Sequence, residues 1–334
     1  MPKLRLFVQL CALNEREHIA AVIRDIPREI PGIACVSVLV VDDGSTDDTV
    51  DVSRAAGADH IASHNGNKGL ARAFQTGVDA CLAHGADIIV NIDADGQYRG
   101  EDIPALIEPI LMRQADIVIG DRQTQSLEHF SLAKRWLQKI GSAVVQTAAG
   151  ICVPDAVSGF RAYSREAALR MFVTPLFSYT VQTLIQAGKI GLKVRSVPIV
   201  ACETTRPSRL HKGIVHFIRQ QAEVLLRTYI TYEPLKTFVG LSVPFLLIGL
   251  GLIIRVIIIA LGRGGQFGNV PSLLAGVISL LIGLLLVVTG IIADRIRENR
   301  RLLEEILYRV RKDSARKDGA RKDSALNTGE LDSN

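Results

Sequence analysis

The sequence predicts an α/β fold in which a mainly parallel β-sheet carries helices on both faces, followed by an interfacial helix and a two-helix transmembrane hairpin. Two observations support this prediction. Residues 4 to about 205 alternate Val/Ile/Leu-rich runs with amphipathic stretches, which is typical of parallel strands buried on both faces. The last third of the chain contains two long apolar segments, each long enough to cross a hydrocarbon core of about 30 Å.

Strands and helices follow one another in simple alternation through the first domain, which we assign to residues 1–210. Strand-like runs cover residues 4–12, 36–44, 60–64, 87–95 and 115–122. Helical patterns cover residues 15–26, 46–56, 69–84 and 102–114. Because ligands bind outside the carboxyl ends of the strands in such sheets, polar residues at these ends are candidate site residues. They are Asp42, Asp43, Asp93, Asp95, Asp121 and Arg122.

The segment after this domain, residues 211–236, places apolar side chains broadly on one helical face and basic ones beside them. This pattern predicts an amphipathic helix that lies in the membrane interface. An ordinary surface helix packed on the first domain is the alternative. The two apolar segments, about 238–261 and 270–293, then predict a transmembrane hairpin over residues 237–293.

Arginines indicate the orientation of the hairpin. Four of them directly follow the second span, at positions 295, 297, 300 and 301, which places that end in the cytoplasm by the positive-inside rule. With two spans and no signal-peptide pattern at the N-terminus, we expect the first domain on the cytoplasmic side of the cell membrane. Arg255 interrupts the first span; it either snorkels to the far interface or pairs with an acidic lipid or substrate group.

The remaining C-terminal residues are strongly charged. Residues 294–312 predict a charged cytoplasmic helix, and the Arg-Lys-Asp repeat in residues 313–334 predicts a disordered tail. The net charge of +5 is concentrated around the apolar segments and aromatic residues make up only 5% of the chain, which favours an anionic membrane surface and no nucleic acid as partner. The five cysteines are widely spaced, so neither a zinc site nor a disulfide framework is indicated.

Two acidic strand ends carry the metal chemistry. Asp93 and Asp95 follow the fourth apolar run, one residue apart, and would repel each other unless a positive group lies between them. A divalent cation shared with a diphosphate relieves that repulsion, and Gln97 offers a neutral oxygen ligand. Asp42 and Asp43 form the second acidic end.

Basic residues complement these acids. A glycine-rich loop with Lys68 and Gly69 enters a helix that begins near Arg72, and backbone N–H groups at such a helix start favour phosphate. The other candidates for phosphate recognition are Arg122, Lys134, Arg135, Arg206, Ser208, Arg209 and Lys212. Clustered arginines suit bidentate contacts to phosphate; solvated surface charges are the alternative for each one singly.

The motifs that carry this chemistry resemble those of a known family. In order they read CALNERE, VVDDGSTDDT, NKGLARAFQTG, NIDADGQY, GDR and VSGFRAYSRE. Together they resemble glycosyltransferase family 2 with the GT-A fold, over about residues 4 to 235. The SGFRAY stretch and the trailing hairpin resemble the branch that acts on dolichyl or polyprenyl phosphate, typified by dolichol-phosphate mannose synthases.

The resemblance implies a role for each candidate. Asp93 lies by the donor's ribose or diphosphate, Asp43 by its nucleobase region, and Asp95 with Gln97 holds Mg²⁺ or Mn²⁺. Asp93, Asp95, Arg122 and Arg135 form the catalytic set. The nucleotide-sugar donor is bound by Ala12, Asn14, Glu15, Asp42, Asp43, Lys68, Gly69, Asp93, Arg206, Ser208 and Arg209. The acceptor phosphate is received by Arg122, Lys134, Arg135, Ser158 and Arg161.

The implied reaction is inverting transfer of a sugar from a nucleotide sugar to a lipid monophosphate at the membrane. Such a phosphate is already anionic at pH 7, so its attack needs no general base. Leu13 stands where many family members have a tyrosine beside the base, which leaves GDP- and UDP-sugars both open. A hydroxyl-bearing lipid acceptor, a catalytically silent membrane scaffold and a phosphohydrolase are the alternatives, and a homo-oligomer stays open beside a monomer.

Overall fold

The computed structural model divides the chain into two compact units, Met1–Gln221 with Glu304–Asn334, and Ala222–Leu303. The residues that the structure describes are 4–122, 146, 149–151, 153–173, 179–200, 202, 230–262 and 270–329, with side chains of the last range described as far as 314. Each unit is considered by itself below.

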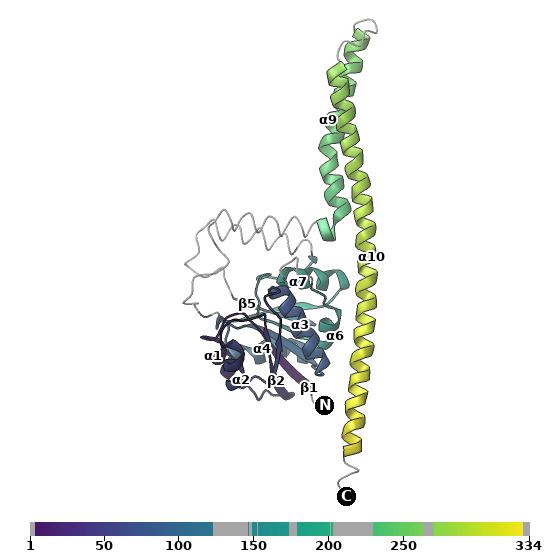
Figure 1. The fold of residues 1–334 in the computed structure, drawn as a ribbon. Helices are drawn as coiled ribbons and strands as arrows, with labels where there is room; N and C mark the ends of the chain where they lie inside the picture. The colour runs from purple at the N-terminus through teal and green to yellow at the C-terminus, as the bar shows by residue number, and fades with distance from the viewer. Residues whose placement is uncertain are drawn as a thin grey trace. The chain divides into compact units, whose positions relative to one another are not determined.

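The first unit is built on a seven-stranded sheet with the strand order β3-β2-β1-β4-β6-β5-β7 (Figure 1). The strands are β1 Leu4–Ala12, β2 Ile33–Asp42, β3 His60–Ser63, β4 Ile88–Asp93, β5 Ile117–Asp121, β6 Arg161–Ser164 and β7 Val194–Pro198. All neighbours pair in parallel except that β6 runs antiparallel to both β4 and β5. The predicted α/β class with a mainly parallel sheet is confirmed.

Helices cover both faces of this sheet. They are α1 Ile19–Asp25, α2 Thr49–Ala55, α3 Leu70–Ala83, α4 Ile103–Leu111, α6 Arg165–Arg170 and α7 Tyr179–Ile190, with a 3₁₀ turn at Gly100–Asp102. The four helices expected from the sequence are all present, and each is shorter than predicted. The first one starts late because residues 15–18 form turns after Asn14, whose φ is 54°.

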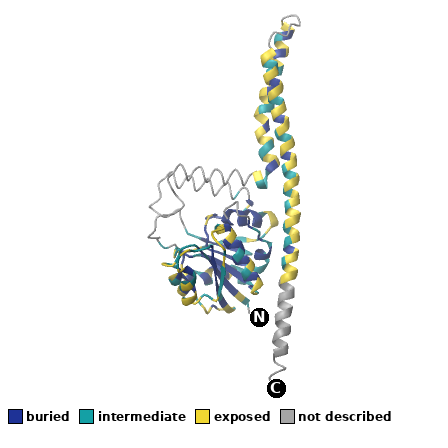
Figure 2. Ribbon diagram, in the orientation of Figure 1, coloured by how far each residue is buried: buried dark blue, intermediate teal, exposed yellow. Residues whose placement is uncertain are grey.

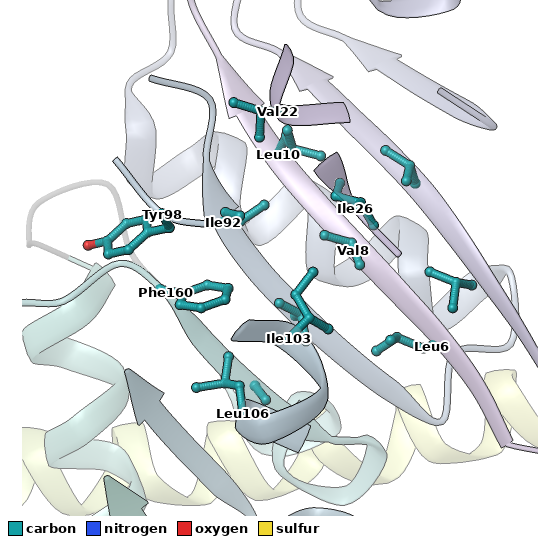
Figure 3. Packing of buried hydrophobic residues seen from close by; sticks show 14 of the residues in the cluster. Leu6, Val8, Leu10, Val22, Ile26, Ile92, Tyr98, Ile103, Leu106 and Phe160 are labelled. Atoms are coloured by element: carbon teal, nitrogen blue, oxygen red, sulfur yellow. The ribbon is translucent and has the colours of Figure 1, made fainter. Parts of the chain in front are cut away.

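The main core lies on one face of the sheet, where alternate residues of β1 meet α1 and α4. Figure 3 shows Leu6, Val8 and Leu10 of β1 packed with Ile92 of β4 and Ile103 of α4. Figure 2 shows the central strands of the sheet as largely buried. The period of two along β1 turns the intervening residues to the opposite face, where the fully buried Gln9 lies against Gly77 of α3.

The sheet register brings the acidic strand ends together. Ala12 at the end of β1 pairs with Asp42 of β2, and Cys11 pairs with Asp93 of β4. The carboxyl ends of β2, β1 and β4 therefore lie along one edge, as expected for parallel strands.

The second unit consists of two long helices, α9 (Pro234–Gly262) and the first part of α10 (Val270–Gly329). Each contains an 18-residue window of mean hydropathy 2.7, of which only 17% is buried, so both are long and apolar enough to cross a membrane. They pack through small residues: Gly249 lies against Gly276 and Leu280, and Ser279 Oγ donates to the Phe245 carbonyl at 2.8 Å. Close packing of this kind is common between membrane helices.

The C-terminal region differs from the sequence prediction. The structure continues α10 without a break to Gly329, whereas a charged helix over 294–312 and a disordered tail from residue 313 are expected from the sequence. Ala, Arg and Lys are strong helix formers, so the repeat satisfies backbone propensity although it lacks an apolar stripe. The predicted interfacial helix lies outside the described residues for positions 211–229, and the remaining 230–236 lead into α9.

Candidate active site

The turn after β4 carries the acidic pair at the sheet edge. β4 ends at Asp93, and the Asp95 Oδ1 atom accepts a hydrogen bond from the Gln97 amide at 3.1 Å. An aspartate that bonds its own backbone two residues on forms a local turn. This turn keeps Asp93, Asp95 and Gln97 half-buried at the edge of the domain, where a ligand can reach them.

Asp93 lies directly against the backbone of Gly159. A Cβ atom at Gly159 would lie 2.5 Å from Asp93 Oδ2 and 2.8 Å from the Tyr179 hydroxyl, so only glycine fits there. The Gly159 amide donates to the Tyr98 hydroxyl at 3.2 Å. Burial and the neighbouring Asp95 raise the pKa of Asp93 to about 7, while Arg122 and Arg161 oppose that rise. The carboxylate pair therefore still favours an added cation.

The buried side-chain amides of Gln9 and Asn91 hold the residues next to Asp93 in place. Gln9 Nε2 donates to Asn91 Oδ1 at 2.9 Å, and Asn91 Nδ2 donates to the Gly159 carbonyl at 2.8 Å. The same amide nitrogen lies 3.3 Å from the Tyr179 hydroxyl. Because buried hydrogen bonds of this kind are costly to break, the network holds Gly159 and Tyr179 in place beside Asp93.

Arg122, directly after β5, is held by a carboxylate that the sequence reasoning missed. Its Nε and Nη2 atoms donate to Asp155 Oδ2 and Oδ1 at 2.7 and 3.1 Å. The Asp155 side chain is 1% exposed and that of Arg122 is 16% exposed. A bidentate pair fixes the plane of the guanidinium, and the charge of Arg122 acts on Asp93. Arg122 is therefore a positioned cation beside the acidic pair.

Arg161 occupies a different place from the one expected. It is fully buried, and its guanidinium donates to the carbonyls of Ser158, Thr180 and Ala156, each at 2.8 Å. With these bonds its donors are directed into the protein, so the expected contact between Arg161 and an acceptor phosphate does not fit this placement. Its role in the structure is to fasten the 156–159 loop, which contains the fully buried Ser158, to α7.

Asp43 organises the second half of the edge. Its two carboxylate oxygens accept hydrogen bonds from the amides of Lys68 and Gly69 at 2.9 and 2.8 Å, and His64 Nδ1 lies 2.7 Å from Oδ1. Gly44, with φ +81°, lies so close to Gly66 that a Cβ atom would fall 2.5 Å from its carbonyl carbon. The hydrogen bonds of Asp43 thus connect the loop after β2 with the loop after β3.

The loops after β1 and β2 are joined in the same way. The Ser45 amide donates to Asp42 Oδ1 at 2.9 Å, and the Asn14 amide donates to Ser45 Oγ at 2.9 Å. The Glu15 amide donates to Thr49 Oγ1 at 2.9 Å. Ala12, which pairs with Asp42, is therefore followed by a loop tied to the DDGS turn through both backbone and side chains.

The structure thus brings most of the predicted site residues to one sheet edge. Lys134, Arg135, Arg206, Ser208, Arg209 and Lys212 lie outside the described residues. Sequence reasoning missed His64, Tyr98, Asn91, Asp155 and Tyr179. Two of these had a visible signal, since Tyr98 follows Gln97 directly and Asp155 lies three residues before Ser158. The others come from strand interiors, helix starts or distant loops.

The β4 exit offers oxygen ligands for a metal ion. Within residues 4–122 and the other described ranges, no group of three or more His, Cys, Asp or Glu side chains converges on one point. Asp93 and Asp95 do form a carboxylate pair, with the Gln97 amide two residues further on. Hard divalent cations accept such oxygen ligands and often complete their shell from bound phosphates. The residues therefore fit Mg²⁺ or Mn²⁺ bound together with an anionic ligand.

Comparison with known proteins gives consistent matches. Residues 8–172 match the model of the family described as glycosyl transferase family 2. A UDP-N-acetylglucosamine–dolichyl-phosphate N-acetylglucosaminyltransferase of Methanococcus voltae is 30% identical over 49% of this chain and 73% of its own. The undecaprenyl-phosphate mannosyltransferase of Micrococcus luteus is 28% identical over 53% of this chain and 77% of its own.

A solved structure gives a matching fold. Glucosyl-3-phosphoglycerate synthase of Mycobacterium tuberculosis, crystallised with Mn²⁺ and UDP-glucose, superposes with a TM-score of 0.51 at 25% identity. The match covers 67% of this chain and 78% of that one.

Replacing Asp43 by Asn tests whether the Asp43 carboxylate connects the loops after β2 and β3. The asparagine side chain has one acceptor oxygen where the Asp43 carboxylate has two, so one of the backbone N–H groups of Lys68 and Gly69 loses its acceptor. We expect the free energy of local opening of this loop to fall by about 1–2 kcal/mol. Hydrogen exchange of the Lys68 and Gly69 amides measures this. Asp48→Asn is the matched control because Asp48 is exposed and makes no capping bond. Unchanged protection of both amides in Asp43→Asn would contradict the assignment.

Proposed function

The chain belongs to glycosyl transferase family 2, and from this premise we propose that it transfers a sugar from a GDP- or UDP-sugar to a polyprenyl or dolichyl monophosphate with inversion. It is a glycosyltransferase of the polyprenyl-phosphate branch. The observation that carries the finer proposal is the pairing of two carboxylates at the β4 exit with the fixed cation Arg122 at the β5 exit. A divalent cation held by the carboxylate pair would offset the charge of the anionic donor, and Arg122 would offset the charge of the anionic acceptor.

The donor is proposed to bind on the side formed by the first two loops. Backbone groups around Asn14, Asp42 and Asp43 are held rigidly there, and Lys68 with Gly69 enters α3 next to them. Asp95 and Gln97, with Asp93, would hold Mg²⁺ or Mn²⁺, which neutralises charge on the departing nucleoside diphosphate. The glycosyltransferase-like neighbour crystallised with Mn²⁺ and UDP-glucose supports a divalent cation in this fold. Arg206, Ser208 and Arg209 are proposed to close over the diphosphate.

The acceptor is proposed to bind on the Arg122 side. Arg122 keeps donors beyond those that bond Asp155, and a guanidinium whose plane is already fixed loses little entropy when it binds phosphate. Lys134 and Arg135 are proposed to complete this subsite, whereas Ser158, expected there from the sequence, is fully buried and is not included. Arg161 is not included, because its donors are directed to backbone carbonyls of its own loop and α7.

In the proposed reaction the lipid phosphate oxygen attacks the anomeric carbon in line with the bond to the nucleoside diphosphate. A carbon–oxygen bond forms to the acceptor as the bond to the diphosphate breaks, and the anomeric configuration inverts. No proton has to leave the acceptor, since the phosphate is ionised at neutral pH. The chain's own contribution is to orient the two anions and offset their charge.

The membrane arrangement follows from the two apolar helices. We propose that α9 and the first part of α10 span the membrane as a hairpin and that the catalytic unit faces the cytoplasm. The support is the group of arginines at 295, 297, 300 and 301 after the second span. A lipid-phosphate acceptor is presented at such a surface, which agrees with the acceptor class of the curated relatives.

Asp95→Asn tests the proposal in an incorporation assay. The full chain, polyprenyl phosphate and Mg²⁺ are incubated with a panel of labelled GDP- and UDP-sugars, and labelled lipid is counted. The variant keeps the turn but weakens cation binding, so we expect transfer to fall by at least about 100-fold. Glu101→Gln, an exposed acid six residues on that pairs with Arg99, should keep wild-type transfer. Wild-type turnover in Asp95→Asn would contradict the metal assignment.

Gly159→Ala tests the position of Asp93. The added methyl group overlaps Asp93 Oδ2 and the Tyr179 hydroxyl, and displacement of a reacting group by about 1 Å costs roughly 100-fold in rate. We expect that loss in the same assay, with thermal unfolding recorded to confirm that the variant is folded. Val157→Ala changes an exposed residue of the same loop and should leave transfer unchanged. A folded Gly159→Ala variant with full activity would exclude the proposed role of Asp93.

A further inference from the structure

The C-terminal part of α10 makes specific contacts with the catalytic unit. We call Glu304–Lys312 the docking segment; it belongs to the same compact unit as the sheet. Tyr308 is only 8% exposed, and its hydroxyl donates to Glu166 Oε1 of α6 at 2.8 Å. The Arg170 guanidinium lies 4.2 Å from the centre of the Tyr308 ring. A buried tyrosine with both a hydrogen bond and a cation–π contact is a strong anchor.

A second anchor lies one turn further along. Arg311 Nη2 donates to Asp79 Oδ1 of α3 at 2.7 Å, and Nη1 donates to the Met171 carbonyl, just after α6, at 2.7 Å. The guanidinium also lies 5.8 Å from the centre of the Phe172 ring. Arg311 therefore joins α3 to the stretch Met171–Val173, and its side chain is 15% exposed.

Only one face of the docking segment makes these contacts. Tyr308, Arg311 and Lys312 share that face at three- and four-residue spacing, and Lys312 Nζ donates to the Tyr308 hydroxyl at 2.9 Å. On other faces Ile306 and Val310 are exposed, and Arg309 pairs with Glu305 of its own helix. The interaction is thus a defined docking face and not a general collapse of the helix onto the domain.

The contacted stretch leads to the active site. The Val173 amide donates to Gln75 Oε1 at 2.7 Å, and Gln75 Nε2 donates to Asp79, the residue held by Arg311. The Phe172 carbonyl accepts from Gln186 Nε2 of α7 at 2.7 Å. The Met171–Val173 stretch is therefore bonded to α3 through Val173 and to α7 through Phe172.

At its start, α7 carries Tyr179, which borders Asp93. Its hydroxyl lies within hydrogen-bond distance of Asn91 and next to the position that a Cβ of Gly159 would take. Its ring stacks on Phe74 of α3 with the centroids 4.5 Å apart. A chain of packed and bonded groups thus connects Arg311, through Met171–Val173 and α7, with the wall of the site.

We propose that the docking segment positions the Asp93 side of the active site: Tyr308 anchors the segment on α6, and Arg311 holds Met171–Val173 and, through that stretch, α7 and Tyr179 against Asp93. Tyr308 and Arg311 are positioning residues, since neither reaches the reacting atoms. The kinetic consequence of this inference rests on the proposed function, whereas the contact between the docking segment and the catalytic unit does not depend on that function. The docking segment continues the helix that contains the second apolar span, so the helix predicted to cross the membrane also supplies a support for catalysis.

The test compares the full-length double variant Tyr308→Ala/Arg311→Ala with wild type. Without the anchors, Met171–Val173 is freed, and we expect hydrogen exchange of the Phe172 and Val173 amides to become at least about 10-fold faster. We expect KM for the nucleotide sugar to rise about 10-fold while KM for polyprenyl phosphate stays unchanged. A purely structural role would lower the active fraction and leave both KM values unchanged.

Matched variants keep the test decisive. Arg309→Ala, on an exposed position of the same segment, should show wild-type exchange and kinetics. If the double variant does not give a cooperative thermal transition, Tyr308→Phe decides: it keeps the ring under Arg170, removes the hydroxyl's bonds to Glu166 and Lys312, and should give a smaller change in the same direction. Wild-type exchange at Phe172 and Val173 together with wild-type KM for the nucleotide sugar would overturn the proposal. If wild type transfers no sugar to the lipid, the proposed function fails, and the exchange result alone then supports or overturns the docking contact.

Discussion

The contact between the Asp93 carboxylate and the backbone of Gly159 is the constraint around which this site is built. The carboxylate is packed between Gly159 and Tyr179 and lies one residue away from Asp95, so its negative charge is costly in the absence of a countercharge. Arg122, directly after β5, supplies part of the compensation across the intervening β6, and Asp155 holds Arg122 in place. With a divalent cation bound to the carboxylate pair and Arg122 fixed nearby, this edge suits reactants that are themselves anionic.

The fold makes this contact possible by mixing strand directions. The parallel strands β1, β2 and β4 deliver the acids to one edge. The antiparallel strand β6 inserts between β4 and β5, and the loop that precedes it brings Gly159 against Asp93. Arg161, the first residue of β6, fastens that loop by bonding its carbonyls. The arginine of the SGFR stretch thus acts as a support for the site, and the glycine before it provides the space.

The sequence predicts the parallel core and the acidic edge because both depend on local patterns: apolar runs, helical periodicity and aspartates at strand exits. It does not predict β6 and β7. It also does not predict the partner of Arg122, because Asp155 lies 33 residues further along the chain. The contact between Arg161 and the acceptor phosphate is expected from the sequence, but Arg161 is buried in the structure. Burial depends on tertiary packing, which a local sequence pattern does not show. The docking of Tyr308 on Glu166 bridges 142 residues and leaves no trace in local pattern.

The central claim is that the acceptor's own charge takes the place of a general base. The most direct measurement gives the full chain the same lipid in two forms, polyprenyl phosphate and the free polyprenol, with one nucleotide sugar and Mg²⁺, and compares the initial rates of sugar transfer. The account predicts transfer to the phosphate and a rate to the alcohol lower by at least about 100-fold, because general base catalysis that the alcohol requires is worth that much. Equal rates with the two lipids, or a higher rate with the polyprenol, would contradict it.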